Sequence, residues 1–254
     1  MSHRDFSNQL ESFRQESEVV AQLVYGDFAV NQAALDSNEV FAAMNETPRL
    51  WNLWAYATQV ASFMALGRLF DMKSSYSLDA LLDSMQKNIH DFQENGLRAR
   101  KDPKGENPAW LDSYLAEAYY PTYDDVKRLR KMVDRRRAIY DRMIKPARHK
   151  YFAHREKHEA NAVRDLFQRG TIDELWLLTS FLLQLHDQLF QLYFNGRKPV
   201  FRRTPYSIRS VRKRAANSSR PHHKLILEIS ETMRRIVAGS PSNSFKPNPF
   251  GGSA

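Results

Sequence analysis

Arginine and histidine side chains that could act on a phosphodiester stand close together in residues 148–154, which read RHKYFAH. An arginine guanidinium offers a fixed fork of donors that suits phosphate oxygens. Histidine can donate or accept a proton near neutral pH. Arg148 and His154 together suit RNA cleavage, in which one group removes the 2′-OH proton and a cation stabilises the charge that builds on the phosphate. Because this chemistry needs a 2′-OH and no metal ion, it predicts cleavage of RNA and not of DNA.

The residues before this segment predict a long charged helix that Pro146 interrupts. Thr122-x-x-Asp125 resembles a capping box at its start. A narrow apolar stripe follows, formed by Val126, Leu129, Val133, Tyr140 and Met143. A proline inside a helix loses one hydrogen bond and clashes with the preceding turn, so we expect a kink or an end there. On a regular helix Arg148 and His154 would lie about 120° apart, on neighbouring faces that could converge on one groove, especially near the kink or beside a second chain.

The remaining patterns predict an all-α protein, an antiparallel helical bundle with additional helices. No stretch alternates as strands do, and helix start and stop signals recur. The expected helices run from Ser7 toward Val24 or Leu35, from Pro48 to about Asp71, from Ser77 to about Lys87, from Trp110 to Tyr119, from Thr171 to Phe194 and from about His223 to Val237. Residues 93–108 are polar with Gly and Pro, and are expected to form a surface loop.

Apolar residues indicate which helices should be buried. The helix after Pro48 places one set near a broad face: Leu50, Leu53, Trp54, Ala57, Val60, Ala61, Met64 and Leu66. The aromatics Trp51, Trp54, Trp176, Phe181 and Phe190 are expected in the core. The most apolar stretch, Leu175 to Phe194, carries His186 and Asp187, so it predicts a core helix and not a membrane span.

Composition narrows the class of protein further. The chain has 254 residues and no cysteine, which excludes disulfides, thiolate nucleophiles and Cys-ligated zinc. Its first residues lack the apolar segment of a secretory signal. We therefore expect a cytoplasmic protein that binds no cofactor and no membrane.

Positive charge is concentrated after the bundle. Residues 197–224 hold ten of the 38 Lys and Arg residues and none of the 29 Asp and Glu residues, so the rest of the chain is close to neutral. Such clustering suits phosphate binding, and Phe201 and Tyr206 could stack on unpaired bases. The candidate nucleic-acid-binding residues are Arg202, Arg203, Arg209, Arg212, Lys213 and Arg214. A solubilising loop, or a surface for a partner protein or acidic antitoxin, would show the same charge pattern.

The segment RHKYFAHRE resembles the Arg-x(4–6)-His motif of the HEPN superfamily, in the form Arg-polar-Lys-x-x-Ala-His-x-acid. Arg148, Lys150, Ala153 and His154 match this form, while His149 stands where asparagine or aspartate is frequent. The wider context is similar to the AbiU-like abortive-infection branch. In this chain the segments "LGRLFD" (66–71) and "SLDALL" (77–82) precede the motif, and their order matches that branch. The resemblance covers roughly residues 10–195.

This resemblance implies a helical bundle that forms a homodimer, with two motifs lining one cleft. It implies metal-independent endoribonuclease activity that leaves a 2′,3′-cyclic phosphate, often in toxin–antitoxin or phage-defence systems, with a cognate antitoxin as partner. By position, Arg148 would stabilise the phosphate, His154 would transfer protons, and His149 would orient or assist.

Two other functions stay open at this point. Some HEPN proteins are inactive, so the chain could be a module that binds nucleic acid or a protein through residues 197–224. His154 and His158 also stand at the i, i+4 spacing that can hold a metal, with His149 as a third ligand, although no carboxylate is clearly placed with them. We expect the chain to be organised as a HEPN-like domain (1–196), a basic arm (197–224), an amphipathic helix (225–238) and a disordered tail (239–254).

Overall fold

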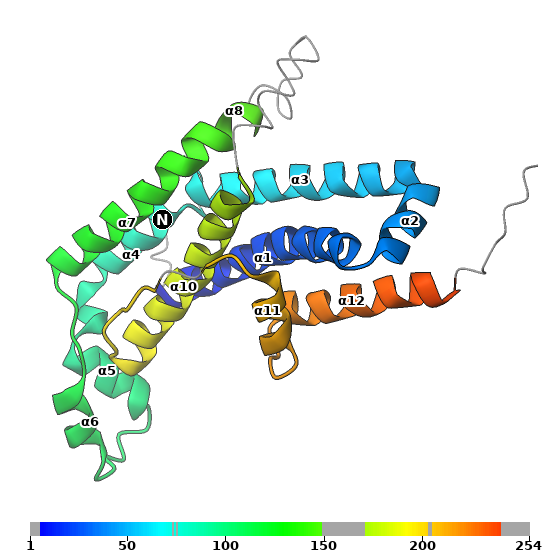
Figure 1. The fold of residues 1–254 in the computed structure, drawn as a ribbon. Coiled ribbons are helices and arrows are strands. Elements are labelled where there is room, and N and C mark those ends of the chain that lie inside the picture. The colour runs from blue at the N-terminus through cyan, green and yellow to red at the C-terminus, as the bar shows by residue number, and fades with distance from the viewer. Residues whose placement is uncertain (1–5, 73, 75, 149–170, 203–204, 240–254) are drawn as a thin grey trace, which may run out of the picture.

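A computed structural model of the chain describes residues 6–72, 74, 76–148, 171–202 and 205–239 (Figure 1). These residues form helices joined by turns and loops, and no strand occurs among them. The predicted all-α class is therefore confirmed. No helix in the described ranges is both long enough and apolar enough for a membrane crossing.

The longest helix, α1 (Phe6–Asp36), forms the centre of the bundle. After α2 (Asn38–Glu46), α3 (Pro48–Phe70) runs back along α1, while α10 (Ile172–Asn195) and α12 (Pro221–Gly239) pack against other sides of it (Figure 1). One continuous core joins these helices. Its fully buried members include Phe6, Val20, Leu66, Leu69, Leu182 and Leu185.

The charged helix α7 (Tyr123–Met143) lies against α4 (Leu78–Lys87). Its predicted apolar stripe is buried throughout, at Val126, Leu129, Val133, Tyr140 and Met143. Two ion pairs reinforce the contact, because Arg130 pairs with Asp83 and Arg137 with Asp79. These pairs hold α7 at a defined place beside the end of α3.

Helix boundaries agree with the predictions where a capping side chain sets them. Ser77 accepts a hydrogen bond from Ala80 N–H at the start of α4. The Asp125 carboxylate accepts one from Thr122 N–H at the start of α7. α10 ends at Gly196, whose φ of 54° is left-handed, as the Asn-Gly pair predicts. The first helix begins one residue before its predicted cap, Ser7.

The prediction of a loop at residues 93–108 is wrong. This region contains α5 (Glu94–Lys101), preceded by the short η1 (Ile89–Phe92) and followed by α6 (Leu111–Glu117). A second small core of Leu97, Leu111 and Leu115 stabilises α5 and α6. α6 begins at Leu111, one residue after the predicted start, and its N-cap is Trp110; the expected cap, Asn107, instead adopts a left-handed φ of 48°.

The prediction of core packing along all of α3 is wrong in its first half. Leu50 is 58% exposed, Leu53 63% and Trp54 39%. Met64 and, on α10, Phe190 are exposed as well, whereas Leu66, Trp176 and Phe181 are buried as predicted. Periodicity identifies an apolar face, but it does not show whether the same chain covers that face.

Residues 197–224 contain a helix of their own, α11 (Ile208–Ala215). Its Ile208 and Val211 belong to the same core as α1 and α12. α12 begins at Pro221, two residues before the predicted start at His223. The predicted disordered tail lies outside the described residues, except for Gly239 at the end of α12.

Candidate active site

Arg148 lies directly after the break in the charged helix. α7 ends at Met143, and α8 (Lys145–Ala147) forms one further turn with Pro146 near its start. The predicted interruption at this proline is therefore confirmed. The Arg148 backbone N–H donates to the Ile144 carbonyl at 2.9 Å, so Arg148 closes the turn and projects from a helical backbone.

The Arg148 guanidinium is anchored by an acid from another helix. Its Nη2 donates to Asp71 Oδ2 at 2.6 Å, and Asp71 is the residue at which α3 ends. The Arg148 side chain is 15% exposed and that of Asp71 is 29% exposed. The pair thus fixes one edge of the guanidinium while part of the side chain still reaches solvent, as a phosphate-binding group requires.

Gly67 provides the space for this arginine. A Cβ atom at Gly67 would lie 2.3 Å from Arg148 Nη1 and 2.8 Å from its Cδ, closer than the 3.0 Å that Cβ contacts in proteins almost never go below. The backbone of Gly67 is ordinary helix, so the reason for glycine here is packing and not conformation. The last turn of α3 therefore forms a slot with Gly67 as its wall and Asp71 as its acceptor.

Tyr140 packs beneath this slot. Its ring stacks on Phe70 with centroids 5.5 Å apart, and its hydroxyl is buried with no hydrogen-bond partner among the described residues. Burial raises the pKa of Tyr140 to about 12, Arg148 opposes this rise, and Asp71 adds to it. The phenol is therefore neutral at pH 7, and it gives the inner side of the site a low polarity that strengthens the Arg148–Asp71 pair.

The two histidines of the predicted catalytic set, His149 and His154, lie outside the described residues. So do His158 and with it the alternative metal site. Of the three predicted catalytic residues, the structure therefore places Arg148 alone. It adds Gly67, Asp71 and Tyr140, to which sequence reasoning gave no role, although Gly67 and Asp71 belong to the LGRLFD segment that carried part of the resemblance.

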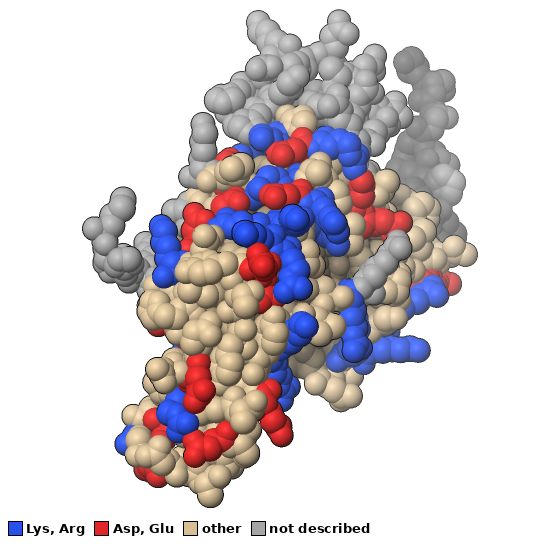
Figure 2. Space-filling view, turned by 90° about the vertical axis from the view of Figure 1, so that its left-hand side faces the viewer, with Lys and Arg blue, Asp and Glu red and all other residues tan. Residues whose placement is uncertain are grey.

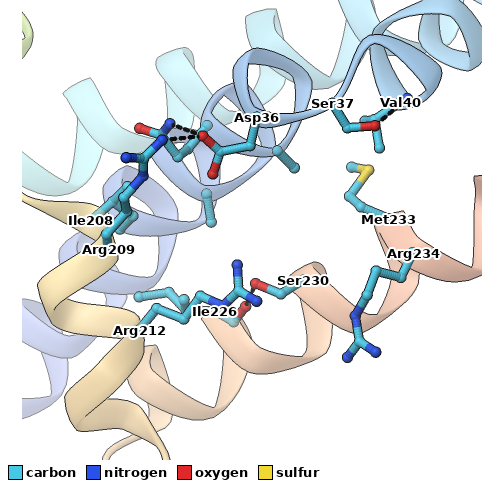
Figure 3. A pocket seen from close by; sticks show the side chains of 13 residues that line it. Asp36, Ser37, Val40, Ile208, Arg209, Arg212, Ile226, Ser230, Met233 and Arg234 are labelled. Carbon is cyan, nitrogen blue, oxygen red and sulfur yellow. Dashed lines mark hydrogen bonds and ion pairs between the residues drawn. The ribbon is translucent and has the colours of Figure 1, made fainter.

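The described residues of the basic arm lie on two different parts of the structure. The backbone N–H of Arg202 donates to Gln184 on α10, whereas Arg209, Arg212, Lys213 and Arg214 lie on α11. Arg209 and Arg212 line a pocket of about 250 Å³ between α1, α2, α11 and α12, and Arg209 pairs there with Asp36 (Figure 3). Arg203 lies outside the described residues.

The basic side chains of α7 are largely balanced by neighbouring acids. Lysines and arginines alternate with acids over the face that includes α7 (Figure 2). On α7 itself, Lys127 pairs with Asp124, and Arg137 contacts both Asp79 and Asp134. Most of the charge on this helix therefore positions it and contributes little to a field that would attract a polyanion.

The structure shows an all-helical protein in which an arginine stands at a break in a charged bundle helix, an arrangement that fits a HEPN-type bundle. The family model described as AbiU2, within the HEPN class, matches residues 4–217. The chain belongs to this HEPN AbiU2 family, as the motif and its context predict, and the match extends beyond the expected range to include α11. No curated protein and no solved structure shows a significant match to the chain.

Proposed function

We propose that the chain is a metal-independent endoribonuclease of HEPN type. In this mechanism His154 transfers protons, removing one from the 2′-OH of the substrate. The 2′ oxygen then attacks the adjacent phosphorus, the bond from phosphorus to the 5′ oxygen breaks, and that oxygen takes up a proton to become a 5′-hydroxyl, which leaves a 2′,3′-cyclic phosphate. Arg148 stabilises the negative charge that develops on the phosphate, and His149 orients or assists.

The observation that supports this role is the way in which Arg148 is held. An arginine needed only for solubility would extend into water, yet this one enters a glycine-walled slot and pairs with Asp71. Such anchoring lowers the cost of orienting the guanidinium toward a phosphate. Family membership supports the same proposal, because the motif that includes Arg148 lies within the matched residues.

The test is incubation of the purified chain with single-stranded RNA in EDTA. Wild type is expected to cut the RNA and leave 2′,3′-cyclic phosphate ends, whereas Arg148→Ala and His154→Ala should not. The matched control is Lys145→Ala, which removes an exposed cation three residues from Arg148. Equal cutting by all four proteins would reject the assignment, and loss of cutting in EDTA would favour the metal site at His154 and His158.

We also propose that the active form is a homodimer. The first half of α3 supports this, because its apolar side chains are exposed in the single chain. They include Leu50, Leu53, Trp54 and Tyr56. Exposed apolar patches of this kind are typical of protein interfaces. A second chain at this surface would bury them and could supply the second motif of the cleft.

The biological role proposed for this activity is that of a cytoplasmic toxin or phage-defence effector, held in check by a cognate antitoxin. Membership of the AbiU2 family supports this role. Induced expression of wild type should arrest cell growth and degrade cellular RNA, whereas expression of Arg148→Ala should do neither. Growth arrest by both proteins would show that toxicity does not depend on the site.

A second candidate is a non-catalytic HEPN module that binds nucleic acid or a partner through the arm. The exposed cations of α11 favour it: the Arg209 side chain is 72% exposed, and Arg212, Lys213 and Arg214 are exposed as well. It predicts binding without cleavage, abolished when Arg202, Arg203, Arg212 and Arg214 are neutralised together. Binding that persists in that variant and does not vary with salt would count against it.

A further inference from the structure

A groove of about 840 Å³ lies between α7 and α10. Met132 and Arg136 of α7 line one side of it, and residues 173–184 of α10 line another. Phe201, Arg202, Pro205 and Tyr206 complete the lining from the segment that precedes α11. The groove therefore joins the basic arm to the helix that leads into Arg148.

Aromatic rings form much of this lining. Phe201 stacks on Phe181 with centroids 6.1 Å apart, and Tyr206 meets Trp176 edge to face at 5.2 Å. Trp176 and Phe181 are buried, Phe201 is partly buried, and Tyr206 is 37% exposed. The inner rings thus hold the outer rings in place, and Phe201 and Tyr206 are accessible for stacking by a flat ligand.

Two arginines in the groove lack a carboxylate partner among the described residues. The Nε atom of Arg136 is buried without a hydrogen-bond acceptor there, and its guanidinium lies 5.3 Å from the Phe181 ring centroid. Burial lowers the pKa of Arg136, and Arg135 lowers it further. Its neighbour on α7, Arg137, pairs with two aspartates instead. A partly buried, uncompensated cation is costly, so Arg136 favours an anionic ligand.

The two ends of the groove differ in charge. Arg136, Phe181 and Arg202 lie toward one end, because Arg136 contacts Phe181 and the Arg202 N–H binds Gln184 one turn further along α10. Asp173 and Glu174 lie at the other end, where α10 begins. Glu174 is engaged by Thr171 and Arg142, which leaves Asp173 as the acid most able to repel a phosphate.

We propose that this groove binds single-stranded RNA, with phosphates on Arg136 and Arg202 and a neighbouring base stacked on Phe201 or Tyr206. The two arginines favour a ligand with negative charge. The accessible rings beside them favour a ligand that also has flat bases. Arginines next to accessible aromatic rings are typical of proteins that bind single-stranded nucleic acid. An acidic peptide would satisfy the arginines but would leave the ring faces without a flat partner.

The position of the groove is suited to a substrate. α7 leads from Arg136 toward Arg148, and the separation of twelve residues between these positions corresponds to roughly 18 Å along a helical path. The ion pair between Arg142 and Glu174 joins the end of α7 to the start of α10, so the two walls of the groove meet at the end of α7 that leads to Arg148. The claim that the groove holds the substrate for cleavage at Arg148 rests on the proposed ribonuclease function. The claim that the groove binds RNA does not depend on that function.

The experiment measures fluorescence anisotropy of a labelled single-stranded RNA of 12 nucleotides with the full chain. All proteins carry His154→Ala so that binding is observed without cleavage. Adding Arg136→Gln and Arg202→Gln should weaken binding about tenfold. Because each lost phosphate contact on a single strand changes the slope by about 0.7, the plot of log affinity against log salt should become less steep by about 0.7 to 1.4.

The matched control is the pair Lys131→Gln and Arg135→Gln, which removes the same charge from exposed residues of α7 that do not line the groove. It should bind RNA nearly as well as the parent. Phe201→Leu with Tyr206→Leu should weaken binding without changing the salt slope, because stacking carries no net charge. Thermal unfolding of each protein checks that the fold is retained.

Equal weakening of RNA binding by the groove pair and by the control pair would overturn the proposal. The proposal would also fail if the parent protein did not bind RNA, or if it bound an acidic peptide and no RNA. The activity result is separate. If wild type cuts RNA but the groove variant binds as its parent does, the groove proposal fails and the ribonuclease stands. If wild type cuts nothing but the groove variant loses binding, the ribonuclease fails and the groove stands.

Discussion

The slot at the end of α3 exists because glycine, which has no side chain, stands at position 67. Arg148 and Asp71 are 77 residues apart in the chain, and their contact depends on the space that Gly67 leaves beside the guanidinium. Glycine in the interior of a helix normally costs about 0.5–1 kcal/mol relative to alanine. Its presence in a buried turn is therefore explained by the arginine that it admits.

We predict that Gly67→Ala lowers RNA cleavage, because the new methyl group would displace the Arg148 side chain from its position beside Asp71. Stability should change little, since the better helix propensity of alanine offsets the loss of the partly exposed ion pair. Cleavage rates and thermal unfolding provide the two readouts. The control Gly26→Ala, also in a helix, would meet a flexible Leu225 methyl at 3.3 Å and should keep its activity.

A second residue-scale feature is the histidine pair that joins α12 to α1. His222 is buried, with its Nδ1 atom 2.7 Å from Glu18 Oε2. Burial alone would raise the pKa of Glu18, but the hydrogen bond to His222 and the nearby positive charges outweigh it, so the pKa is below its usual value. Burial, followed by His222 and Arg220, lowers the pKa of His223 to about 4.

These shifts predict that acid destabilises the fold below pH 6.5. Between pH 6.5 and about 4 the unfolded His223 takes up a proton and the folded one does not, so stability falls as pH falls. The Glu18 contribution is fully present above about pH 4.5 and is lost below it as the folded carboxyl protonates. Urea midpoints at pH 7 and pH 5 measure the effect.

In His223→Gln the drop between pH 7 and pH 5 should become smaller, because this variant lacks the group that titrates. His90→Gln is the control, since the His90 side chain is 74% exposed on η1. A drop of the same size in wild type and in His223→Gln would show that this histidine does not produce the pH dependence.

At the scale of single elements, the start of α10 is stabilised by side chains of its first turn. Thr171 Oγ1 accepts from Glu174 N–H at 3.2 Å, and Glu174 Oε2 accepts from Thr171 N–H at 3.1 Å, which completes a capping box. Glu174 also pairs with Arg142 near the end of α7. One cap therefore starts a core helix and ties it to α7, the helix that leads to Arg148.

We predict that Thr171→Ala lowers the free energy of unfolding by about 1 kcal/mol, because the Glu174 N–H loses its acceptor. Thr171→Ser keeps the hydroxyl and should retain most of the wild-type stability. Urea denaturation of the three proteins measures the difference. Equal stability of the alanine and serine variants would mean that the box contributes little to folding.

On the scale of the whole molecule, the first half of α3 is an apolar surface that the described residues of the single chain do not cover. This helix is apolar on nearly all sides, and most of its second half is buried while Leu50, Leu53 and Trp54 face solvent. A helix of this kind is normally surrounded by protein. The second half also carries Gly67 and Asp71, so an interface at the first half would lie on the helix that positions Arg148.

We predict that Leu53→Glu combined with Trp54→Glu converts a dimer into a monomer, because two charges would have to be buried in an apolar interface. Sedimentation velocity measures the oligomeric state, and cleavage should be lost with the dimer if two motifs form one cleft. The control is Leu227→Glu, an exposed leucine of α12 that should not affect assembly. Dimers that persist in the α3 variant would place the interface elsewhere.

Local signals predicted the parts of the fold that a few neighbouring residues determine. The starts of α4, α7 and α10 follow from cap residues within one turn, and the end of α10 follows from Asn195-Gly196. α5 was not predicted, because its stability comes from Leu97 packing on Leu111 and Leu115 and from Arg100 lying 4.0 Å from the Tyr193 ring centroid. Such contacts join residues that no local pattern links.

The sequence by itself determined the helical class, the family motif around Arg148, the break at Pro146 and the concentration of charge after residue 196. These depend on backbone preferences and residue types, which act within a few positions of the chain. Only the tertiary structure decided that Asp71 and Gly67 hold Arg148, that the arm divides between a groove and α11, and that half of α3 stays uncovered. Those outcomes depend on how helices pack, which is set by the shape of the whole core.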